Sequence, residues 1–148
     1  GPAGATGATG PLITANNARF VNSSTTINVP VGASVPFTVN AELNGTAISH
    51  IPGSTNIILA PNQTYYASYQ ITSSSSNGNV GYQLSLNGNI ISGSGASASQ
   101  AAPSPVEASL SASAVFSTGN APNILTLDGS VNVVQNGEGA VLNVIKLQ

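Results

Sequence analysis

Residues 56–71, NIILAPNQTYYASYQI, contain the patterns that decide the fold class. Residues 56–59 form a short apolar run that ends at the turn-forming sequence Ala-Pro-Asn of residues 60–62. After this turn, apolar or aromatic residues occupy every second position, at Tyr65, Ala67, Tyr69 and Ile71. Successive side chains of a strand point to opposite faces. The alternation therefore predicts a strand that buries Tyr65 and Tyr69 and turns Tyr66 the other way.

Similar short segments lie on both sides of this stretch. Further strands are expected at residues 35–39, 82–86, 90–91, 108–116, 124–127, 131–134 and 141–147. Asn87-Gly88 predicts a hairpin because both residues tolerate positive φ, and residues 136–139 (NGEG) are expected to turn the chain before the last strand. Residues 92–105 are rich in Gly, Ala, Ser and Pro and are expected to form a long exposed connection. About ten short antiparallel strands without helical periodicity predict an all-β sandwich or jelly roll.

The first residues follow a different rule. Gly1, Gly4, Gly7 and Gly10 keep a strict three-residue period, with proline after the first and the fourth of them. Only glycine fits at the crowded axis of a collagen triple helix, so the period predicts the end of a collagen-like stalk. The alternative is a flexible Gly/Ala/Thr linker. We expect the stalk to occupy residues 1–12 and the β head residues 13–148.

Charged residues are unusually scarce. They make up 4% of the chain, against roughly 25% in typical soluble domains. Two cations cannot build the basic surface that a phosphate backbone or an anionic membrane attracts, so we expect no nucleic-acid partner. Apolar positions are interrupted too often for membrane insertion. The chain has no cysteine, which excludes a disulfide framework and a thiolate site.

The residues that carry chemistry are few and scattered. His50 is the single histidine, has no acidic neighbour in sequence and precedes Ile-Pro-Gly, so we expect a solvated or interface side chain in a loop. Catalysis by a histidine needs a nucleophile and an orienting group beside it. The four carboxylates are dispersed, and no dense Asp/Asn loop suggests a calcium site. We expect no enzyme activity, no cofactor and no metal.

The order of a collagen-like segment and a β head resembles the tumour-necrosis-factor and complement type of jelly roll, which caps collagen stalks. Residues 56–69 (NIILAPNQTYYASY) resemble a hydrophobic strand, a turn and a Tyr-rich strand of that superfamily. Residues 82–88 (YQLSLNG) resemble its next hairpin, and residues 140–147 occupy the place of its last strand. This resemblance implies a homotrimeric head.

Within that superfamily the chain resembles the bacterial collagen-like exosporium glycoproteins of the BclA family. Gly-Ala-Thr triplets, a head rich in Ala, Ser, Val and Asn, and the absence of cysteine carry this resemblance. It implies a place in the filaments on the spore exosporium of a Gram-positive bacterium and sugar on the stalk residues Thr6 and Thr9. The low proline content of the triplets departs from a stable collagen sequence.

Trimer formation also has a physical argument. A collagen stalk needs three chains in register, and a trimeric head raises the local concentration of the stalk segments. The side chains expected to pack in the core or around the trimer axis are Tyr65, Tyr69, Tyr82, Leu84, Phe116 and Val144. We therefore expect a structural surface module that trimerises, registers the stalk and forms the tip of a filament. Two alternatives are an adhesin head that recognises a host protein or glycan, and the tip of a phage tail fibre.

Overall fold

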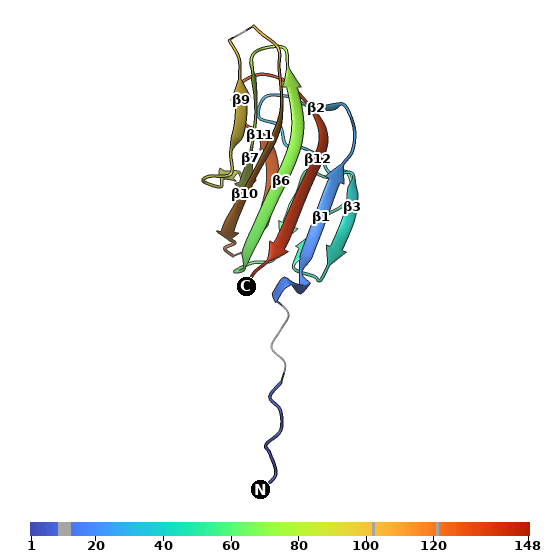
Figure 1. Ribbon diagram of the computed structural model, residues 1–148, viewed down its shortest axis with the longest axis vertical. Coiled ribbons are helices and arrows are strands. Elements are labelled where there is room, and N and C mark those ends of the chain that lie inside the picture. Colours follow the sequence, from blue (N-terminus) through green and yellow to red (C-terminus); the bar gives the residue numbers. More distant parts are fainter. Residues whose placement is uncertain (9–12, 102, 121) are drawn as a thin grey trace.

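Twelve β-strands and one short 3-10 helix make up the regular structure of the described residues in the computed structural model (Figure 1). The structure describes residues 1–8, 13–101, 103–120 and 122–148. The elements are η1 (Ile13–Ala15), β1 (Asn17–Asn22), β2 (Ile27–Val29), β3 (Val39–Asn44), β4 (Ile48–Ser49), β5 (Ile57–Leu59), β6 (Thr64–Ser75), β7 (Asn79–Leu86), β8 (Asn89–Ile90), β9 (Ala96–Ser99), β10 (Val106–Ser117), β11 (Asn123–Gly129) and β12 (Gln135–Lys146).

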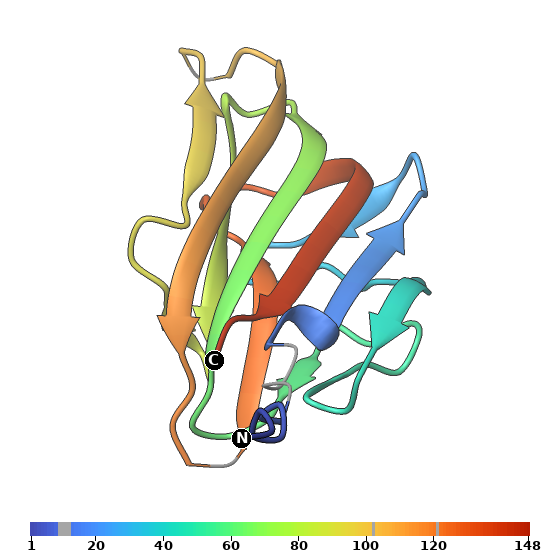
Figure 2. The same cartoon turned by 60° about the horizontal axis from the view of Figure 1, so that its bottom comes forward.

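The strands form two six-stranded antiparallel sheets that pack face to face (Figure 2). Sheet A has the order β10-β6-β12-β1-β3, with β2 also paired to β12. Sheet B has the order β4-β5-β11-β7-β8, with β9 also paired to β7. Strands that are neighbours in a sheet are mostly distant in sequence, as Greek-key crossovers require. The predicted all-β sandwich is confirmed.

The alternating pattern of the central strand positions the core. In β6 every second residue from Tyr65 to Ser75 is buried, while the residues between them are partly or fully exposed. Facing them, Tyr82 and Leu84 of β7 are fully buried. The predicted hairpin at Asn87-Gly88 is confirmed, since β7 and β8 pair directly across it and both residues have positive φ (53° and 80°).

The two termini of the head meet at one end of the sandwich. The backbone N–H of Lys146 donates to the carbonyl oxygen of Asn16 at 2.9 Å, so the entry to β1 lies beside the exit from β12. The turn between β6 and β7 lies at the opposite end (Figure 1). Because β12 spans twelve residues at about 3.3 Å per residue, roughly 36 Å separate the terminus end from what we call the tip.

Three details of the sequence prediction were wrong. Residues 136–139 do not turn the chain, because β12 runs through them with a bulge at Gly139 (φ 62°); the chain bends at residues 131–133 instead, where a strand over 131–134 was expected. Residues 92–105 contain β9, which pairs with β7. Residues 35–38 are not a strand, because the backbone N–H groups of Val35 and Phe37 donate to Leu127 and Ser54 rather than to a regular ladder.

Candidate functional site

The outer face of sheet A is formed by long strands and carries few charges. It is formed by the residues of β10, β6 and β12 that alternate with the buried ones. Cross-strand register places them in rows: Val115–Tyr66–Ile145, Ser113–Ser68–Asn143, Ser111–Gln70–Val141, Ser109–Thr72–Glu138 and Glu107–Ser74–Asn136. The first three rows contain no charged side chain. We call these three rows the neutral face.

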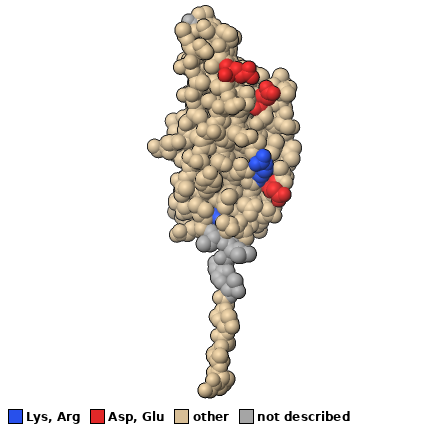
Figure 3. All heavy atoms as spheres, in the orientation of Figure 1, with Lys and Arg blue, Asp and Glu red and all other residues tan. Residues whose placement is uncertain are grey.

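Charged residues border the neutral face, and one of them contacts it, since Arg19 donates a hydrogen bond to Asn143 Oδ1 at 3.2 Å. Glu107 and Glu138 lie in the two rows nearest the tip. Arg19 and Glu42 are cross-strand partners on β1 and β3, beyond β12. Figure 3 shows this face with acidic atoms gathered towards the upper end and one basic group beside an acidic group at the right-hand edge. A broad uncharged area of small side chains remains between them.

The edge strand β10 adjoins the neutral face and is open on one side. It is the terminal strand of sheet A, twelve residues long, and after Glu107 it contains no charge and no proline. Natural sheets protect such an edge with charges, proline, bulges or a covering segment, because unpaired N–H and C=O groups pair with other chains. Its inward residues Ala112, Ala114 and Phe116 are only half-buried, and Val115 on the outer side is 63% exposed.

Most of the side chains that the sequence singled out lie inside the sandwich. Tyr65, Tyr69, Tyr82, Leu84 and Val144 are at most 3% exposed. Phe116 differs, since it stands on the edge strand and is half-buried while its ring stacks on that of Tyr65 at a centroid distance of 6.1 Å. Five of the six thus pack between the two sheets of one chain, and Phe116 alone reaches the open edge.

The buried tyrosines fasten the two sheets together through their hydroxyl groups. The Tyr69 hydroxyl on β6 lies 2.8 Å from the carbonyl oxygen of Ser94 and 3.1 Å from that of Tyr82 on β7. The Tyr82 hydroxyl in turn lies 2.8 Å from Ser73 Oγ. Burial raises the pKa of Tyr69 to about 12 and also raises the pKa values of Tyr65 and Tyr82, where hydrogen bonds partly offset it. All three remain neutral phenols at physiological pH.

His50 is buried, and the expectation of a solvated or interface side chain was wrong. It is 7% exposed and packs between the rings of Phe20 and Phe37, at centroid distances of 4.8 and 6.5 Å. Its Nε2 lies 2.8 Å from the carbonyl oxygen of Ser54, and its Nδ1 lies 2.5 Å from Asn40 Oδ1. These contacts join the loop after β4 to β1 and β3. With no nucleophile or carboxylate among its contacts, His50 has a structural role.

The remaining chemical groups are dispersed. Among the residues that the structure describes, no three His, Cys, Asp or Glu side chains gather where a metal ion could bind. Asp128 accepts a hydrogen bond from Ser34 Oγ at 2.6 Å and contributes to local structure. Thr6 is exposed, whereas Thr9 lies outside the described residues. No helix in the described part of the chain is long and apolar enough to cross a membrane.

Comparison with protein families gives one match. A family model described as the BclA C-terminal domain matches residues 15–148, which is nearly the whole chain and all twelve strands. No curated protein matches the sequence.

Solved structures share the fold at low sequence identity. The globular domain of zebrafish complement 1qA protein is 11% identical with a TM-score of 0.69, and the match covers 90% of this chain and 98% of that one. Eiger TNF from S. frugiperda is 12% identical with a TM-score of 0.68, covering 90% and 92%. Murine APRIL is 14% identical with a TM-score of 0.61, covering 88% and 99%. The predicted jelly roll of the tumour-necrosis-factor and complement type is confirmed.

Proposed function

Since the chain belongs to the BclA C-terminal domain family, we propose that it is the trimerising head of a collagen-like spore-surface glycoprotein. Three heads associate through the neutral face of sheet A and the open edge of β10. The head brings three stalk segments together in register and forms the outer end of an exosporium filament. In this role the protein is a structural module without catalytic activity.

The open, uncharged edge of β10 is the observation that carries this proposal. An edge strand of twelve residues without a charge beyond Glu107 is an aggregation risk in a monomer, whereas a second copy of the chain covers it in an oligomer. The serines of the neutral face are short enough for a flat, close approach. The neutral face itself contains no ion, and burying an unpaired ion is one of the largest costs of burying a polar surface.

The stalk argues for three copies rather than two. The Gly-X-Y triplets of residues 1–12 need two further chains to form a triple helix. Chain entry and chain exit lie at the same end of the head, so three associated heads would gather their stalks at that end. Thr6 and Thr9 occupy the third position of their triplets and are our proposed attachment sites for sugar.

Solution mass tests the proposal directly. We expect size-exclusion chromatography with light scattering to give three times the 14.6 kDa chain mass, independent of concentration. Ser113→Glu introduces a carboxylate in the middle row of the neutral face, on the open edge strand β10, and a trimer that buries this edge would have to bury three of them. Burying unpaired charges costs several kcal/mol, so this variant should be monomeric at micromolar concentration.

A matched control separates this effect from a general effect of charge. Ser49 is exposed on the outer face of sheet B, so Ser49→Glu adds the same charge away from β10 and should leave the trimer intact. A wild-type protein that remains monomeric at every concentration contradicts the proposal. So does a Ser113→Glu variant that stays trimeric with the elution volume of the wild type, because the interface then lies elsewhere.

A further inference from the structure

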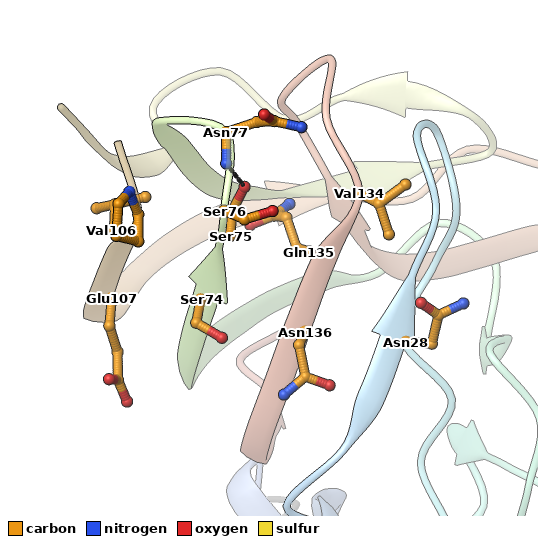
Figure 4. A pocket seen from close by; sticks show the side chains of 11 residues that line it. Asn28, Ser74, Ser75, Ser76, Asn77, Val106, Glu107, Val134, Gln135 and Asn136 are labelled. Carbon is orange, nitrogen blue, oxygen red and sulfur yellow. Dashed lines mark hydrogen bonds between the residues drawn. The ribbon is translucent and has the colours of Figure 1, made fainter. Parts of the chain in front are cut away.

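A hollow of about 640 Å³ lies near the tip, where four parts of the chain meet (Figure 4). Asn28 comes from β2, Asn77 from the turn after β6, Glu107 from β10 and Asn136 from β12. The floor is Gln135, which is 2% exposed and fixed by hydrogen bonds to Gly81. We call this hollow the tip pocket. Its volume is of the size that binds small ligands in other proteins.

The polar groups around the tip pocket have unused hydrogen-bonding capacity. The side chains of Asn28, Asn77 and Glu107 make no hydrogen bond to another described residue, and Asn136 makes one long bond of 3.4 Å to the carbonyl oxygen of Thr25. Several asparagine amides elsewhere in the head are engaged, and Asn22, for example, donates to Pro36 at 2.9 Å. The donors and acceptors at the tip are therefore available to a ligand.

The composition of the lining selects the class of ligand. The pocket has no Lys, Arg or His, so nothing in it neutralises an anion, and it has a single carboxylate, which is too few for a tight calcium site. Three amides each offer a donor and an acceptor, and Ser74, Ser75 and Ser76 add hydroxyl groups. Pro105, Val106 and Val134 form an apolar side. Hydroxyl groups next to C–H surfaces are what this lining complements.

We propose that the tip pocket binds a neutral saccharide. The Glu107 carboxylate accepts hydrogen bonds from sugar hydroxyl groups, the amides of Asn28, Asn77 and Asn136 bridge to others, and Val134 contacts the C–H face of the ring. The site lies at the end of the head opposite the stalk, where a filament would meet other surfaces. It does not depend on trimer formation.

Charge explains why the pocket stays open if the head does trimerise. Glu107 on β10 lines the tip pocket, and Glu138 on β12 lies in the neighbouring row of sheet A. Three copies of these carboxylates packed in a dry interface would repel one another, so the buried contact is confined to the neutral face nearer the stalk. The tip end of the same face then remains solvated and accessible.

Saturation-transfer and chemical-shift NMR test this proposal with neutral probes. A panel of methyl glycosides of hexoses, 6-deoxyhexoses and N-acetylhexosamines is titrated to 50 mM against ¹⁵N-labelled protein. We expect at least one glycoside to saturate and to shift the side-chain amide signals of Asn28, Asn77 and Asn136. Asn77→Ala removes one hydrogen-bonding partner, and Glu107→Gln replaces a charged acceptor by a weaker neutral one, so each should weaken binding about fivefold or more.

The controls separate a specific site from weak surface contact. Asn44 is exposed at the stalk end, so Asn44→Ala should leave binding unchanged. Ser113→Glu should bind like the wild type whatever its mass, which keeps this test independent of the trimer test. The proposal is overturned if no glycoside of the panel gives saturation transfer, if the shifts lie outside the tip pocket, or if Asn77→Ala and Glu107→Gln bind as well as the wild type.

Discussion

Gln135 is the buried polar side chain whose removal should reveal most about how the two sheets are held together. It stands on β12 of sheet A, and its amide reaches Gly81 on β7 of sheet B. Its Oε1 accepts hydrogen bonds from the Gly81 N–H at 2.8 Å and from Ser73 Oγ at 3.2 Å, and its Nε2 donates to the Gly81 carbonyl at 2.9 Å. One side chain thus satisfies both polar backbone groups of a residue in the opposite sheet.

The expected cost follows from those groups. In Gln135→Leu the Gly81 N–H is left buried and unpaired, which costs about 1–3 kcal/mol, whereas the Gly81 carbonyl keeps the hydrogen bond that the Ser130 N–H donates at 3.0 Å. Ser73 keeps its hydrogen bond to the Tyr82 hydroxyl. We therefore expect Gln135→Leu to lower the free energy of unfolding by about 1–3 kcal/mol, although leucine preserves most of the side-chain volume.

Comparison with alanine makes the prediction sharper. Gln135 forms the floor of the tip pocket, so Gln135→Ala opens the space to water that can bind the Gly81 groups. Alanine should then cost no more than leucine. At an ordinary core site such as Leu142, which is fully buried, the smaller alanine is instead the more costly residue. There, Leu142→Ala should cost about 2–5 kcal/mol through the cavity it leaves.

Urea unfolding followed by circular dichroism measures these differences. The series is best made in the Ser113→Glu background, because the stability of an oligomer depends on its concentration. A Gln135→Leu variant within about 0.5 kcal/mol of its parent would refute the reasoning, since unpaired buried backbone groups cannot be that inexpensive. A Gln135→Leu variant clearly more stable than Gln135→Ala would show that volume, not hydrogen bonding, dominates at this site.

Three further predictions concern stability. Burial raises the pKa of Tyr69 in the folded protein to about 12. The stability that the neutral hydroxyl of Tyr69 contributes is therefore fully present below its pKa in the unfolded chain, near 10, and is lost as the pH rises towards 12, by up to about 3 kcal/mol. In Tyr69→Phe the free energy of unfolding, measured by urea titration, should fall less steeply between pH 8 and 12. The same pH dependence as in the wild type contradicts this. His50→Ala should cost about 2–4 kcal/mol by opening a cavity and leaving Asn40 Oδ1 without its partner, and a melting temperature equal to the wild type argues against this. Gly45 has a φ of 80° and no room for a Cβ beside Asn16, so Gly45→Ala should lower the melting temperature by several degrees, whereas an unchanged temperature would show that Asn16 moves freely.

Sequence patterns predicted the strands that bury one face and expose the other. The alternation around Tyr65 and Tyr69 corresponds to β6, and the Asn87-Gly88 pair to a hairpin whose two strands are adjacent. Both signals are local, because side-chain direction and turn geometry depend on neighbouring residues. They were sufficient for the fold class and, with the glycine triplets, for the resemblance to the BclA family.

Features decided by distant residues were not predictable. Asn136-Gly137 looks like a turn, yet Gly137 lies within β12, where a Cβ would come within 2.9 Å of Ile71 Cδ1. The bulge at Gly139 continues the strand instead. His50 is enclosed by Phe20 and Phe37, which lie 30 and 13 positions earlier in the chain, so nothing local indicated its burial. The tip pocket likewise joins four separate segments, and no spacing in the sequence predicts it.

The scarcity of charge has two different consequences on the two sheets. On sheet A, the outward residues of β10 and β6 other than Glu107 are Ser, Thr, Gln, Tyr or Val. Hydroxyl groups can exchange water for a partner chain at little cost, whereas each lysine or glutamate would oppose burial. On sheet B the exposed side chains include Ile58 and Ile90, 48% and 64% exposed, with no charge in β5 or β8. The proposed trimer interface would account for the first sheet but not for the second. The surface of sheet B, whose strands contain a single charged residue, Asp128, is instead suited to dense packing of neighbouring heads, because surfaces with little charge repel one another weakly over the Debye length. If this distinction is correct, Ser113→Glu lowers the solution mass of the assembly. Charges added to sheet B leave that mass unchanged and lower only the concentration to which the assemblies can be brought.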